Sequence, residues 1–114
     1  MNYQIVTHNE IIGVHRWENA PEKYAYLRNI HRHVFVIRCK FSVTHSDREI
    51  EINDMQEFID RHFKENFITD PSAGAGIFFG NMSCEDIARY CIDRFACDEC
   101  EVLEDGFGGA YVRN

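Results

Sequence analysis

The chain has 114 residues, 45% of them hydrophobic, and a formal net charge of −7 at pH 7. This length is typical of one domain with one modest core, so residues 1–114 are expected to form a single domain. The negative charge disfavours nucleic acid and anionic membranes as partners, because binding to phosphate needs a basic surface. No apolar run approaches the roughly 20 residues of a membrane helix, and the N-terminus lacks a signal-peptide pattern. A cytoplasmic protein is therefore expected.

Five cysteines, an odd number, do not indicate a secreted disulfide framework. Cys97 and Cys100 form a Cys-x-x-Cys pair, but no second pair is present to complete a structural zinc site. The other cysteines fit the apolar faces of expected elements: Cys39, Cys84 and Cys91. Five reduced thiols are the favoured interpretation, and a redox or metal role for Cys97 and Cys100 stays open.

The first 30 residues are expected to form a strand and a loop. Residues 3–17 are rich in β-favouring side chains, which predicts a strand that Asn9-Glu10 can interrupt. Gly13 within it either weakens the strand or marks a bulge or a close approach of another segment. Residues 18–30 lack a clear period and contain Pro21, which predicts a long loop.

Residues 31–43 show the alternation of an extended strand, in which side chains two apart point to the same face. One of the two faces is apolar, and the opposite face carries most of the charge. A turn at 44–47 and a short third strand at 48–52 are expected to follow. The apolar face ends in two imidazoles and comprises His31, His33, Phe35, Ile37, Cys39, Phe41 and Val43.

Two amphipathic helices are expected in the second half of the chain. The first has Asn53 or Asp54 as its N-cap and ends before Thr69. Its apolar stripe comprises Met55, Phe58, Ile59, His62, Phe63 and Phe67. The second is capped by Ser83, which has a capping-box-like spacing to Asp86. Its apolar stripe comprises Cys84, Ile87, Ala88, Cys91, Ile92 and Phe95.

The two glycine-containing stretches are interpreted differently. Residues 71–81 are expected to form a flexible loop, since no phosphate-binding helix start follows their Gly-x-Gly. Residues 101–112 are expected to form a strand, interrupted or bulged at its glycines. The resulting order, β-β-β-α-α-β, predicts an α+β domain with an antiparallel sheet and two helices on one face. Its open face and edges favour oligomerisation.

Two histidines at the end of a core-facing row can share a metal ion, because imidazole nitrogen suits zinc and similar ions. If residues 3–17 fold back as an antiparallel partner, His15 joins His31 and His33 as a third ligand. Three histidines with an open position commonly hold catalytic zinc. The alternative is a hydrated pair near the surface, which is less favoured because the apolar row would bury both imidazoles. The remaining histidines are expected to be ordinary residues: His8, His45 and His62.

Five short motifs follow one another along the chain: Gly13-Val14-His15-Arg16-Trp17, His31-Arg32-His33-Val34-Phe35, Glu51-Ile52-Asn53-Asp54-Met55, Met82-Ser83-Cys84-Glu85-Asp86-Ile87-Ala88, and Leu103-Glu104-Asp105 with Gly109-Ala110-Tyr111. Their order resembles that of the 6-pyruvoyl-tetrahydropterin synthase and 6-carboxy-tetrahydropterin synthase family. The family counterparts are Ala-Ala-His, His-Gly-His-x-Tyr/Phe, Ile-Asp-Phe-x-x-Leu, Pro-Thr-x-Glu-x-Ile-Ala and a terminal Glu-Thr…Gly strand. The likeness spans roughly residues 11–112.

This resemblance implies the tunnelling fold (T-fold), in which subunits join their sheets into a barrel, typically a homo-hexamer built as a dimer of trimers. It implies zinc held by His15, His31 and His33, and a pterin or purine-like ligand anchored by Glu104, which is also the candidate catalytic residue. A carboxylate that accepts two N–H bonds from a ring edge binds strongly and directionally. Without the resemblance, Glu104 is one solvated carboxylate in an acidic run.

The activity implied by the resemblance is that of a lyase in tetrahydropterin or queuosine-precursor synthesis. Zinc acts as a Lewis acid on the side-chain hydroxyls of dihydroneopterin triphosphate or a relative, and proton transfers lead to loss of triphosphate. An enzyme of this kind is the first hypothesis. A non-catalytic pterin- or purine-binding protein is the second, and a structural oligomer with a vestigial site is the third.

The departures from the family pattern concern proton transfer. Leu27 stands where the family has its catalytic cysteine, and the Asp-His pair has no counterpart. Asp105 replaces a threonine and is electrostatically unfavourable near a triphosphate. Metal and ring binding are therefore better supported than the family reaction. Loop residues that can replace the acid or base are Glu18, Glu22, Tyr24 and Tyr26, and residues that can neutralise a phosphate tail are Lys23, Arg28 and Arg32.

Overall fold

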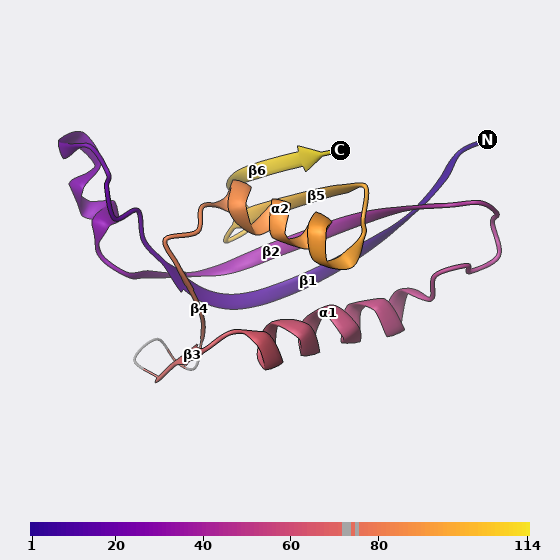
Figure 1. Ribbon diagram of the computed structural model, residues 1–114, viewed down its shortest axis with the longest axis horizontal. Helices are drawn as coiled ribbons and strands as arrows, with labels where there is room; N and C mark the ends of the chain where they lie inside the picture. Colours follow the sequence, from indigo (N-terminus) through magenta and orange to yellow (C-terminus); the bar gives the residue numbers. More distant parts are fainter. Residues whose placement is uncertain (72–73, 75) are drawn as a thin grey trace.

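The computed structural model describes residues 1–71, 74 and 76–114, so part of the loop expected at 71–81 lies outside the described residues. The fold is α+β, as predicted, and its strands form one six-stranded sheet in the order β3-β4-β1-β2-β5-β6 (Figure 1). The sheet is mixed rather than wholly antiparallel, because β4 runs parallel to β1. The elements are β1 (Tyr3–His15), the 3-10 helix η1 (Glu22–Arg28), β2 (His31–Val43), α1 (Ile52–Asn66), β3 (Thr69–Asp70), β4 (Gly76–Gly80), α2 (Cys84–Phe95), β5 (Glu99–Glu104) and β6 (Gly108–Arg113).

The long β1–β2 pair forms the centre of the sheet. Its antiparallel register runs without interruption from Tyr3 opposite Val43 to His15 opposite His31. The predicted alternation along β2 is confirmed, because Phe35, Ile37 and Cys39 are fully buried on one face. Figure 1 shows this pair running along the length of the molecule, with η1 at one end. The β1–β2 pair is therefore the central part of the sheet, against which the other elements pack.

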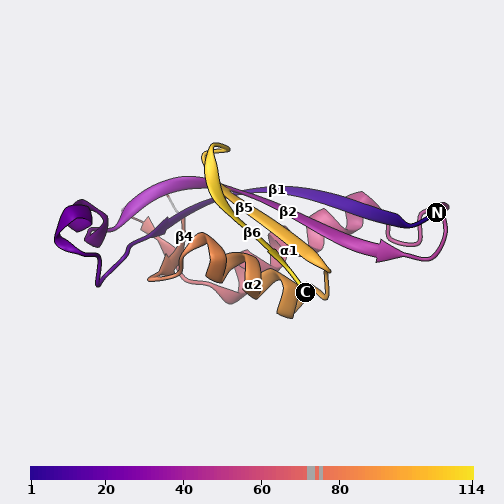
Figure 2. The same ribbon diagram turned by 90° about the horizontal axis from the view of Figure 1, so that it is seen from above.

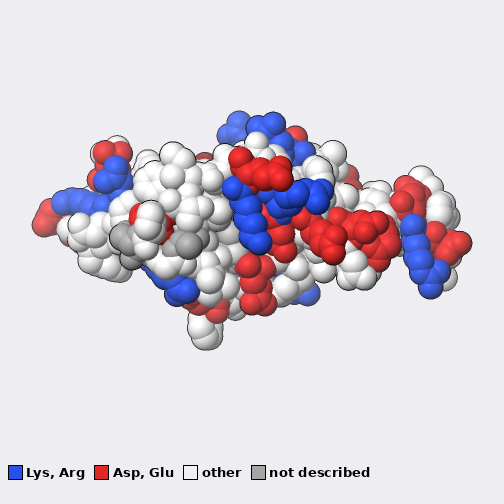
Figure 3. Space-filling model, turned by 90° about the horizontal axis from the view of Figure 1, so that it is seen from below, with Lys and Arg blue, Asp and Glu red and all other residues white. Residues whose placement is uncertain are grey.

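Both α-helices cover the same face of the sheet (Figure 2), as predicted. Phe63 of α1 and Cys91 of α2 are fully buried in the core between the helices and the sheet. Acidic and basic side chains mingle on the outer surface seen from the α1 side (Figure 3), which fits a helix with only one buried stripe. No helix in the described part of the chain is long and apolar enough to cross a lipid bilayer.

The start of α1 differs from the prediction. Residues 48–52, all of which the structure describes, do not form the expected strand. The backbone at Arg48 has a φ of 52°, which breaks an extended chain. The N-cap is Glu51 rather than Asn53 or Asp54, because its carboxylate accepts the N–H of Asp54 at 2.6 Å. By contrast, the predicted capping box at the start of α2 is confirmed.

Three other segments contain more structure than predicted. The loop expected at 18–30 includes η1. The loop expected at 71–81 contains β4, which pairs with β3 just before that loop, and Ile77 of β4 pairs with Gly13 of β1. The single strand expected at 101–112 is a hairpin of β5 and β6, which turns through Gly106 at a φ of 80°. Glycine in a strand and a parallel partner far along the chain both weaken the sequence signal for a strand.

Gly13 marks a close approach, one of the options left open by the sequence. A Cβ placed there would lie 2.5 Å from Cε2 of Phe79 and 3.1 Å from Cδ2 of Phe35. Both rings are buried, and Phe79 packs edge-to-face on Phe35 and Phe63, so neither ring can move aside easily. The missing side chain lets β4 and its aromatic residue approach the end of β1 that carries His15.

We predict that Gly13→Ala lowers the free energy of unfolding by about 1–3 kcal/mol, because the added methyl overpacks a filled core. Gly108→Ala is the matched control, since a Cβ at Gly108 meets no heavy atom within 4 Å. Urea unfolding followed by circular dichroism measures both variants. Equal midpoints for the two variants would contradict this account of Gly13.

Candidate metal centre

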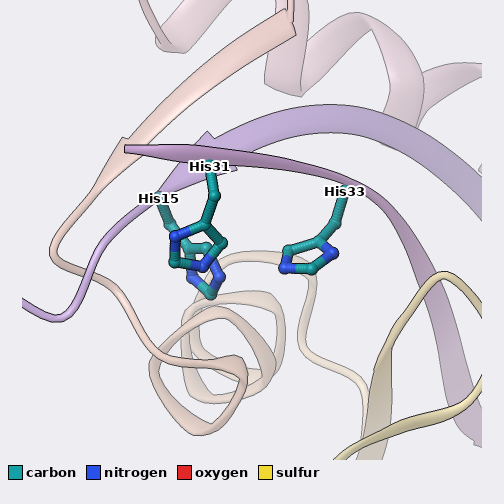
Figure 4. A group of neighbouring side chains, drawn as sticks. All are labelled: His15, His31 and His33. Carbon is teal, nitrogen blue, oxygen red and sulfur yellow. The ribbon is translucent and has the colours of Figure 1, made fainter. Parts of the chain in front are cut away.

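The β1–β2 register places the three predicted metal-ligating histidines together. His15 lies directly opposite His31, and His33 lies two residues further along the same face of β2. Their ring centroids are separated by 4.6 to 5.4 Å, and one nitrogen from each ring lies within 4.8 Å of the others. Figure 4 shows the imidazoles projecting from the sheet into the same space. This group has the ligand number and type of a catalytic zinc site.

Hydrogen bonds orient each imidazole through its Nδ1 atom. A carbonyl or carboxylate oxygen only accepts, so the Nδ1 atom that contacts it carries the proton. The neutral ring then leaves Nε2 free to bind a metal, an arrangement found around ligating histidines. The contacts are His15 Nδ1 to the Met82 carbonyl at 2.9 Å, His31 Nδ1 to the Asn29 carbonyl at 2.8 Å, and His33 Nδ1 to the Asp105 carboxylate at 2.7 Å.

Of the three histidines, His15 has the surroundings that best suit a metal ligand. Its side chain is buried, and among the described residues its Nε2 atom has no hydrogen-bond partner. Nε2 lies 3.0 Å from a carboxylate oxygen of Glu104, but this contact does not have hydrogen-bond geometry. Burial is the main cause of a lowered pKa at His15. The hydrogen bond to Met82 and the charge of Glu104 oppose this shift, whereas His31 and His33 add to it. A neutral imidazole with an unsatisfied buried nitrogen suits a metal ion.

The histidines lie at a cavity of about 640 Å³. Glu104, at the end of β5, points its carboxylate toward them and remains 35% exposed. The predicted metal ligands and the predicted ring anchor therefore share one pocket. The residues lining it are His15, Arg16, Trp17, Leu27, His31, His33, Asn81, Met82, Ser83, Cys84, Glu85, Glu104, Asp105, Phe107, Gly108 and Gly109.

Asp105 holds His33 in place, a role that the sequence analysis missed. One carboxylate oxygen accepts from the His33 ring, and the other accepts the backbone N–H of Val34 at 2.9 Å. These bonds, first that from Val34 and then that from His33, lower the pKa of Asp105, so its carboxyl is ionised at neutral pH. This role depends on the pairing of β5 with β2, which places Glu104 opposite Phe35, and the sequence carries no local signal for that pairing.

The cavity lacks the proton-transfer groups of the resembled family. Leu27 lines it where that family has a cysteine. Cys84 is the cavity's only described cysteine, and burial together with the charge of Glu104 raises its pKa to about 12. A thiol of this kind stays protonated at neutral pH and is a poor base. The proposed replacements Glu18, Glu22, Tyr24 and Tyr26 are not among the lining residues.

The basic residues considered for a phosphate tail also lie elsewhere. Arg28 donates to the Ala20 carbonyl at 2.7 and 2.9 Å and lies near Glu22, and neither Lys23 nor Arg32 lines the cavity. The other histidines lie outside the cluster: His8, His45 and His62.

We predict that Asp105→Asn weakens metal binding by about 10–100-fold, because it removes the charged acceptor that orients His33. Glu85→Gln is the matched control, since it neutralises a carboxylate of the same cavity that has no contact with a histidine among the described hydrogen bonds and ion pairs. Competition with a fluorescent zinc chelator measures the affinity of each variant. Equal losses in both variants would point to a general charge effect instead.

Comparisons with known proteins do not assign a family. No protein-family model matches the chain, and no curated protein matches it. Assignment of a function therefore depends on the geometry of the pocket and on the motifs that it brings together.

Proposed function

We propose that this chain is a zinc-dependent enzyme of the 6-pyruvoyl-tetrahydropterin synthase type, acting on dihydroneopterin triphosphate or a related pterin. The main observation is the cluster of His15, His31 and His33 in one cavity with Glu104. The motifs predicted two parts of a binding site, the metal ligands and the ring anchor. His15 and Glu104, one from each part, lie within contact distance of each other. Three imidazoles and an open cavity suit a zinc ion that also contacts a substrate.

Each residue has a defined role in this proposal. The Nε2 atoms of His15, His31 and His33 would hold zinc, and Glu104 would accept two N–H bonds from the edge of the pterin ring. When bound, zinc supplies Lewis-acid polarisation of a substrate hydroxyl or carbonyl group. Asp105 keeps His33 in the tautomer that presents Nε2 to the cavity.

The charge of the cavity favours a related pterin over a triphosphate within a single chain. Three carboxylates line it, those of Glu85, Glu104 and Asp105, and Arg16 is its only described Lys or Arg. Arg16 lies 3.8 Å from Glu18, which partly offsets its charge. Together with a bound zinc ion, Arg16 would only balance the three carboxylates, so the cavity has no excess positive charge for a triphosphate unless a partner subunit supplied cations.

Assembly through the sheet also belongs to this proposal. The terminal strands of the sheet, β3 and β6, each have one strand neighbour. Val6 and Ile12 are 41% exposed on β1, so apolar side chains remain uncovered on the sheet. Open edges and an apolar outer face support a T-fold homo-oligomer, of which a hexamer is the proposed form.

A second candidate is a non-catalytic protein that binds a pterin or a purine-like molecule in the same pocket. Leu27 in place of the catalytic cysteine and the protonated thiol of Cys84 favour it. Binding would then depend on zinc and Glu104, without elimination of a leaving group.

We predict that the double variant His31→Ala/His33→Ala contains about one zinc ion fewer per chain than the wild type, because two of three ligands are removed. His45→Ala is the control, since His45 is exposed and lies outside the cluster. Elemental mass spectrometry of protein purified without chelators gives the counts. Equal zinc content in wild type and double variant would contradict the metal centre.

We predict that Glu104→Gln weakens binding of dihydroneopterin by about 10–100-fold while zinc content is unchanged, because the ring edge loses a charged acceptor. Pterin fluorescence titration measures binding, with Glu85→Gln as the control from the same cavity. Loss of zinc in Glu104→Gln would show instead that Glu104 is a metal ligand. Release of triphosphate from dihydroneopterin triphosphate by the wild type supports the enzyme, whereas binding without release supports the second candidate.

A further inference from the structure

Four of the five cysteines gather at one point in the core, away from the histidine cavity. Cys39 lies on β2, Cys91 on α2, Cys97 just after α2 and Cys100 on β5. All four are buried, with at most 2% of any of them exposed. Sulfur atoms of Cys39, Cys91 and Cys100 lie within 4.8 Å of one another, whereas the sulfur of Cys97 lies outside this close group.

The spacing of the three grouped sulfurs is compatible with three corners of a tetrahedral metal site. Zinc–thiolate bonds of about 2.3 Å place neighbouring sulfurs of a tetrahedron roughly 3.8 Å apart. Sγ of Cys39 and Sγ of Cys100 are 3.9 Å apart, on residues directly opposite each other in the β2–β5 pair. A disulfide requires about 2.0 Å between sulfurs, so these two would have to approach each other by nearly half their separation.

The backbone holds the four positions in place before any metal is present. Ala96 ends α2 in the left-handed conformation, with a φ of 57°, which turns the chain back toward β2. The N–H of Asp98 then donates to the Lys40 carbonyl at 2.8 Å, and the carboxylate of Asp98 accepts the N–H of Ser42 at 2.6 Å. The Cys97–Cys100 segment is thereby fixed against the strand that carries Cys39.

We propose that Cys39, Cys91 and Cys100 bind a structural zinc ion, separate from the histidine centre, and that the Cys97 side chain turns toward them to supply the fourth thiolate. Four thiolates in a closed tetrahedron are a common structural zinc site, and this one joins β2, β5 and α2. On binding, the four thiols release four protons to solvent and form four zinc–sulfur bonds, with no change in oxidation state. Because the cluster is buried, zinc enters during folding, before the core closes.

Cobalt reports on the two centres separately. We expect wild-type protein refolded with Co²⁺ to show thiolate-to-cobalt charge-transfer absorption in the near ultraviolet. The same absorption should persist in His31→Ala/His33→Ala, which lacks the histidine ligands. It should be lost or strongly reduced in Cys91→Ser and Cys100→Ser, and retained in Cys84→Ala, which removes the buried cysteine that does not belong to the proposed site.

X-ray absorption at the zinc edge makes the test independent of variants that fail to fold. The zinc of wild-type protein refolded with the metal should have sulfur neighbours at about 2.3 Å in addition to nitrogen neighbours at about 2.0–2.1 Å. Refolding with zinc should also raise the thermal midpoint of His31→Ala/His33→Ala relative to refolding without it. Nitrogen neighbours alone, or a disulfide between any two of these cysteines in the zinc-refolded protein, would overturn the proposal. The histidine centre would be unaffected by that outcome.

Discussion

The register of the β1–β2 pair is the constraint on which the rest of the structure depends. Thirteen consecutive residues of each strand face one another, and this pairing places His15 opposite His31. A slip of one residue would turn every side chain of one strand to the other face of the sheet. The buried row that contains Phe35 and Ile37 prevents such a slip, because the slip would expose it to solvent. Core packing at the middle of the pair therefore fixes the geometry of the histidines at its end.

One face of β2 provides two clusters of metal-ligating side chains. The imidazoles of His31 and His33 lie at its open end, beside a cavity, and the thiol of Cys39 lies in its closed centre. Phe35 and Ile37 lie between them along the strand. The difference in burial suits different tasks, because an exchangeable position needs access for a ligand, whereas a structural site does not. Imidazole nitrogens surround the accessible position and thiol sulfurs surround the enclosed one.

Sequence patterns predicted the parts of the fold that depend on interactions between residues close together in the sequence. Alternation along residues 31–43 and the capping box at Ser83 depend on nearby residues, and both are confirmed. The parallel pairing of β4 with β1 has no local signal, because it joins Ile77 to a residue more than sixty positions away. The turn from α2 into β5 depends on a left-handed Ala96, a residue type that rarely marks such a turn.

In the candidate site, too, the features set by nearby residues could be predicted and those set by distant residues could not. The three histidines could be placed together from the expected hairpin, and the structure brings them together. The roles of Asp105 and of the Met82 carbonyl require knowledge of which elements pack beside the hairpin, so they could not be predicted. The convergence of Cys39 with Cys91 and Cys100 likewise arises from tertiary packing, although Cys39 and Cys91 were correctly expected on apolar faces.

The most direct test of this account is an anomalous difference map from crystals of wild-type protein, with data collected on either side of the zinc absorption edge. The account predicts a zinc peak between the Nε2 atoms of His15, His31 and His33, about 2.0–2.1 Å from each. A map with no peak at that position, from protein purified and crystallised with zinc, would contradict the central claim.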